Sequence, residues 1–129
     1  MTASARPLPM TAAALLAGNQ ILTHTSVRGD VPPRLHPVLR EFVDNLPVEQ
    51  RERFAGWCAE AILVSDRLYA ADDANGAMVS AAQARQAVWG SRLRVTRIRE
   101  LGDPTHGQVQ APCRSCAAML EFFGVEEVS

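Results

Sequence analysis

The chain has no lysine, only three cysteines and no long apolar run among its 129 residues. Such a small and odd number of cysteines does not make a disulfide framework, so we expect reduced or metal-bound thiols. The apolar stretch at residues 10–17 is about eight residues long, whereas a membrane-spanning helix needs about 20. A secretory signal would need a basic segment, and only Arg6 precedes this stretch. We therefore expect a cytoplasmic protein without a membrane partner.

Net charge is also nearly absent, at −1 at pH 7. Tight non-specific binding to nucleic acid normally needs a strongly basic face, so this balance argues mildly against it. Hydrophobic residues make up 47% of the chain, which is enough for one domain to fold around a core without cross-links. The composition thus indicates a single globular domain.

The three cysteines lie in two short segments, Cys58-Ala59-Glu60 and Pro112-Cys113-Arg114-Ser115-Cys116. A catalytic zinc ion takes three protein ligands and keeps one position open for water. Three thiolates fill those places. Bound water becomes a nucleophile near neutral pH, and Glu60, two residues after the first cysteine, can carry its proton. The pattern predicts a catalytic zinc site.

The spacing supports this grouping. Cys113 and Cys116 share one face of a helical turn, and Pro112 suits the start of a helix. Cys58 and Glu60 can face one pocket only at the first turn of a helix. Helix N-termini also favour thiolates. We expect the two metal-bearing helices to lie side by side on one face of a sheet.

Other interpretations of the cysteines remain open. A lone CxxC is often a structural zinc knuckle or a redox pair. A structural site could recruit a histidine as fourth ligand, from His24, His36 or His106. Three thiolates around one zinc ion also give a negative centre, and Arg114, between the later cysteines, can offset part of that charge.

The alternation of expected elements indicates an α/β sandwich around a central mixed sheet. A leader, a short helix and a first strand occupy 1–35, and the zinc-binding core occupies 36–129 of a single domain. Periodicity and breaker residues predict helices at 11–17, 36–46, 47–54, 58–71, 80–89 and 113–123, strands at 21–27, 92–101, 108–111 and 125–128, and a loop at 70–76.

Residues 54–69 and 111–123, which carry CAE and PCxxC, resemble the cytidine deaminase-like superfamily, and most closely the bacterial YwqJ-like deaminases. The resemblance implies a three-layer αβα fold and one Zn²⁺ held by Cys58, Cys113 and Cys116. It also implies Glu60 as the proton shuttle and a nucleobase as substrate. We expect conversion of cytosine to uracil in a nucleic acid or nucleotide.

Domains of this family are predicted toxin modules, so the resemblance further implies delivery into a target cell's cytoplasm and an immunity protein as partner. Two alternatives stay open: a deaminase of a free nucleoside or nucleoside-like metabolite, and a non-catalytic zinc-stabilised binding module. Whether the chain is free-standing or part of a longer protein, and its oligomeric state, are also open.

Candidate substrate contacts are weaker. Trp57 can stack on a base, although a core role fits it as well. Thr23 and Thr25 lie on the strand expected at 21–27, which can line the pocket or simply be half-buried. Ala59, between the first ligand and Glu60, is the remaining candidate.

Overall fold

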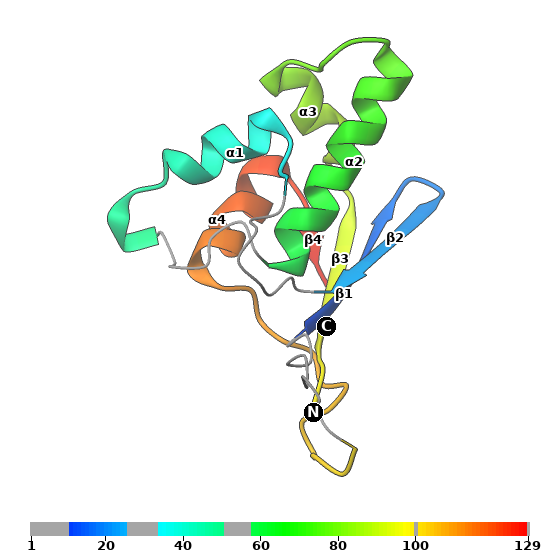
Figure 1. Cartoon of the computed structure of the whole chain (residues 1–129), viewed down its shortest axis with the longest axis vertical. Coiled ribbons are helices and arrows are strands. Elements are labelled where there is room, and N and C mark those ends of the chain that lie inside the picture. The colour runs from blue at the N-terminus through cyan, green and yellow to red at the C-terminus, as the bar shows by residue number, and fades with distance from the viewer. Residues whose placement is uncertain (1–10, 26–33, 51–57, 100, 129) are drawn as a thin grey trace, which may run out of the picture.

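A computed structural model describes residues 11–25, 34–50, 58–99 and 101–128 (Figure 1). The leader expected at 1–9, the second half (51–54) of the helix expected at 47–54, and Trp57 lie outside the described residues. The elements in chain order are β1 (Thr11–Ala17), β2 (Gln20–Thr25), α1 (Pro37–Asp44), the 3₁₀ helix η1 (Val48–Gln50), α2 (Ala59–Asn75), α3 (Ala81–Val88), β3 (Arg92–Arg97), α4 (Arg114–Phe123) and β4 (Glu126–Glu127).

The strands form one mixed sheet in the order β2-β1-β3-β4. β1 pairs antiparallel with β2 and with β3, while β3 and β4 run parallel. The predicted α/β sandwich with a mixed sheet is therefore confirmed. In the described part of the chain the helices lie together on one side of the sheet (Figure 1), so these residues supply the sheet and one helical layer.

The short helix expected at 11–17 is wrong, because these residues form strand β1. Alanine and leucine favour a helix locally, but β1 is hydrogen-bonded on both sides within the sheet. Its alternate residues Ala13, Leu15 and Ala17 are buried under the helices. Gly18, which looks like a helix stop, instead has φ +60 in the two-residue turn of the β1–β2 hairpin.

Helix α2 runs through the middle of the core, as its apolar sequence predicts. Leu63, Val64 and Leu68 are completely buried, and the helix packs against β1, β2 and β3. It extends further than expected: residues 70–75 continue the helix instead of forming a loop, and Gly76 ends it in the left-handed conformation with φ +74. No helix in the described ranges has both the length and the apolar character needed to cross a bilayer.

The segment between β3 and α4 carries less regular structure than expected. Instead of a strand at 108–111, only Val109 makes an isolated bridge, to Thr96. The backbone N–H of Gln110 donates to the Val95 carbonyl, which fixes the approach of the chain to Cys113. The strand expected at 125–128 is present as the short β4.

A completely buried histidine connects α1 to α2. His36 caps α1, where its Nδ1 accepts the backbone N–H of Val38 at 3.2 Å. The proton of the ring therefore lies on Nε2, which donates to the Asp72 carboxylate at 2.8 Å. The backbone N–H of Val79, above all, and the His36 ring hold the pKa of the Asp72 carboxyl below its ordinary value.

We expect Asp72→Asn to lower the Tm by about 5 °C near neutral pH, because the His36 ring and the Val79 N–H lose a charged acceptor. A carboxyl with a depressed folded pKa stabilises the protein above its unfolded pKa of about 3.9, and the contribution disappears as the pH falls through the folded value. Thermal unfolding of both proteins across pH 3–8 should therefore give curves that converge in acid. Asp73→Asn, which changes the neighbouring exposed acid, is the control.

Candidate metal centre

The three cysteines meet where two helices begin. Cys58 is the N-cap of α2, Cys113 is the N-cap of α4, and Cys116 lies in the first turn of α4. Their sulfur atoms all lie within 4.8 Å of one another, and the Sγ atoms of Cys58 and Cys113 are 3.9 Å apart. The structure thus brings together cysteines that are 55 residues apart in the chain, on helices that pack against each other.

These sulfur positions suit a zinc ion. Tetrahedral ligands at the usual Zn–S distance of about 2.3 Å are about 3.8 Å apart, close to the separation of Cys58 and Cys113. The cluster contains no histidine within the described residues. His36 is committed to Asp72 and Val38, and His106 Nδ1 accepts the Arg99 backbone N–H at 3.0 Å. The donor set is three sulfurs, which leaves a fourth position of a tetrahedral ion free.

The cluster favours a thiolate at Cys113. The Cys116 thiol, followed by the Cys58 thiol, donates to its sulfur and lowers the pKa of Cys113 to about 3. The Cys116 backbone N–H adds a further contact at 3.4 Å. The pKa values of Cys58 and Cys116 are raised, above all because these thiols donate to Cys113, and burial adds to the rise. A thiolate held by helix N–H groups is the form of cysteine that binds a metal.

Glu60 lies in the first turn of α2 and is only 4% exposed. Burial, the largest influence, raises the pKa of its carboxyl, and the negative Cys113 raises it further. Its own backbone N–H, which favours the charged carboxylate, and the nearby Cys116 side chain act in the opposite direction and limit the rise. A carboxyl with raised proton affinity beside the sulfurs is suited to accept and return a proton.

The two residues between the later cysteines hold η1 against the start of α4. The Ser115 hydroxyl, which is buried, donates to the Gln50 carbonyl at 2.9 Å. Arg114 is exposed, and its Nη1 donates to the Glu49 carbonyl at 2.9 Å. The influence of Arg114 on the charge of the metal site stays a prediction. The role of Ser115 was not evident from the sequence, because serine inside a CxxC carries no signal for a contact 65 residues away.

The structure describes the side chains of two of the four candidate substrate contacts, one of them away from the cluster and the other next to Cys58 in the chain. Thr23 is exposed and pairs with Ala14, so it lies on the sheet face away from α2. Ala59 is completely buried directly after Cys58. Trp57 and the side chain of Thr25 lie outside what the structure describes.

Comparison with known families extends this picture. The family model described as YwqJ-like deaminase matches residues 2–125. The chain belongs to the YwqJ-like deaminase family. The match confirms the resemblance drawn from CAE and PCxxC, and it also includes the β1–β2 hairpin, which precedes the core expected at 36–129. No curated protein and no solved structure gives a significant match to this YwqJ-like deaminase.

Proposed function

We propose that this YwqJ-like deaminase uses zinc to hydrolyse the exocyclic amine of a nucleobase, most specifically cytosine to uracil in a nucleic acid or nucleotide. The observation that carries the proposal is the buried carboxyl of Glu60 beside three sulfurs that can hold one ion. Family membership supplies the deaminase activity, and the donor set supports zinc as the metal.

The chain's own groups account for the proton movements of such a reaction. When bound, zinc lowers the pKa of a water molecule enough for it to act as a nucleophile near neutral pH. Glu60 accepts a proton from water and delivers protons to the ring nitrogen and to the departing amine, so that water is consumed and ammonia is released. The three cysteines hold the metal and leave one coordination position for this chemistry.

A purely structural zinc site is less well supported by the same geometry. Structural zinc ions are closed by four protein ligands, whereas the described cluster offers three. Burying a carboxyl without need is also unfavourable, and Glu60 is 4% exposed. Both features favour a catalytic centre.

The decisive experiment incubates zinc-loaded protein with cytidine, adenosine, single-stranded DNA, duplex DNA and RNA, and measures ammonia release together with the mass of the base product. We expect ammonia and uracil from a cytosine-containing nucleic acid or nucleotide. Turnover of free cytidine alone would replace this substrate with a nucleoside. Absence of ammonia release from all five, and from cytidine monophosphate assayed beside them, would count against the proposal.

The toxin role has a separate test. Production of the active protein inside bacterial cells should stop growth and leave uracil in the nucleic acid, while the Glu60→Gln protein at equal abundance should permit growth. Equal growth with both proteins would remove the toxin role and leave the reaction untouched.

A further inference from the structure

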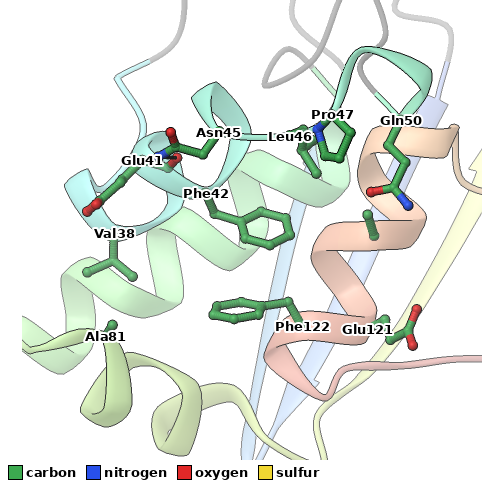
Figure 2. A pocket seen from close by; sticks show the side chains of 11 residues that line it. Val38, Glu41, Phe42, Asn45, Leu46, Pro47, Gln50, Ala81, Glu121 and Phe122 are labelled. Carbon is green, nitrogen blue, oxygen red and sulfur yellow. Dashed lines mark hydrogen bonds between the residues drawn. The ribbon is translucent and has the colours of Figure 1, made fainter.

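A groove of about 700 Å³ lies between α1 and α4, on the helical side of the molecule. Figure 2 shows the rings of Phe42 from α1 and Phe122 from α4 stacked on each other, with centroids 4.7 Å apart, so that together they form an aromatic floor. Val38, Leu46 and Ala81 extend the apolar lining. The groove contains none of the cysteines or Glu60, so it is distinct from the metal centre.

The two charged side chains that line the groove are both acidic. Glu41 stands on the α1 wall and Glu121 on the α4 wall, and both are exposed. The other polar lining residues are the uncharged Asn45 and Gln50, and no basic side chain is among the lining residues. An apolar floor between two carboxylates favours an occupant with apolar and cationic groups, and it repels the phosphates of a nucleic acid.

The aromatic floor is fixed in place. The Arg85 guanidinium lies 4.6 Å from the centre of the Phe122 ring, and its Nε donates to the Phe122 carbonyl at 2.9 Å. Phe123 packs edge-on against both rings, with centroids 5.0 and 6.0 Å away. An occupant therefore does not have to order these rings, which reduces the entropy cost of binding.

We propose that this groove is a docking site for an amphipathic helix of a partner protein, with an apolar stripe on Phe42 and Phe122 and arginine or lysine on both flanks. Grooves between helices bind such helices through apolar anchors at i, i+3, i+4 and i+7. Glu41 and Glu121, on opposite walls, meet the cations of the two flanks. The proposal concerns binding alone and does not depend on the deaminase reaction.

The test uses a fluorescent synthetic peptide of about 15 residues, with leucine at i, i+3, i+4 and i+7 and arginine at the flanking positions. Fluorescence anisotropy should give a Kd of about 10 μM at low salt, rising at least fivefold when glutamate replaces the arginines. Shifts of backbone amide signals by NMR should concentrate on α1 and α4. Failure of the arginine peptide to bind, or equal binding of both peptides, would overturn the proposal.

Variants of the protein locate the site. Glu41→Gln with Glu121→Gln should weaken the arginine peptide about tenfold, and Ala81→Trp, at an exposed position on the groove wall, should block it. Asp73→Asn, an exposed acid outside the groove, should bind as the unaltered protein does. A loss in the Asp73→Asn protein comparable to that in the double glutamine variant, with unchanged binding by the Ala81→Trp protein, would show non-specific charge attraction and reject the groove.

Discussion

Replacement of Glu60 by glutamine should leave about one zinc ion per chain and lower the deamination rate about a thousandfold. Glutamine keeps the size of the side chain in its buried position but cannot accept a proton, and a positioned acid or base typically contributes about 100- to 10,000-fold. Metal analysis and single-turnover deamination, measured on the same preparation, separate these two effects.

A second acid on the same helix provides the control. Asp66 is exposed, and Asp66→Asn removes a carboxyl from α2 without altering the cluster. We expect it to keep full activity.

Because burial raises the pKa of Glu60, the unaltered protein should lose activity as the pH falls through that raised value, above the ordinary glutamate range. Full activity of the Glu60→Gln protein would refute the proposed role of this residue.

The sequence predicted those elements whose signals are local. Helices α1 and α4 were predicted from the helical spacing of their own apolar residues. The end of α4 was predicted from Gly124, which takes the left-handed conformation there. Strand β1 was not, because its alanines and leucines have no strand preference of their own. Its conformation depends on two partners, β2 and β3, and β3 lies some 80 residues further along the chain.

The features of the candidate site also divide into those that the sequence predicted and those that only the fold reveals. The order CAE and PCxxC resembles the pattern of a zinc deaminase, and the proximity of the three sulfurs could be predicted from that resemblance. The burial of His36 against Asp72, and the support of η1 by Ser115, could not, because serine, histidine and aspartate occur in many surroundings. Only the fold brings α1 and η1 to their partners on α2 and α4. The groove between Phe42 and Phe122 has the same origin.

Replacement of Cys113 by serine should remove most of the bound metal and lower the Tm of the zinc-loaded protein by about 10 °C. A ligand that binds only the folded state stabilises it by about 4 kcal/mol when its free concentration is about 1,000 times the Kd. Loss of one of three thiolates forfeits much of that gain, since metal binding and folding are coupled. Thermal unfolding with metal analysis measures both quantities. Ser115→Ala, in the same turn, should lose the bond to Gln50, about 1 kcal/mol, and keep its zinc.

Chelation should narrow the difference in stability, which separates a metal ligand from a residue that only packs. Cys113 is the N-cap of α4, and its sulfur accepts the Cys116 N–H at the long distance of 3.4 Å. Serine is a preferred N-cap with a stronger acceptor, which offsets part of the loss of the hydrogen bonds from the Cys116 and Cys58 thiols. Without metal, the Cys113→Ser protein should therefore differ from the unaltered one by much less than it does with zinc. If the deficit of the variant were the same with and without chelator, the sulfur would stabilise the fold through packing, and the metal centre would lose its main support.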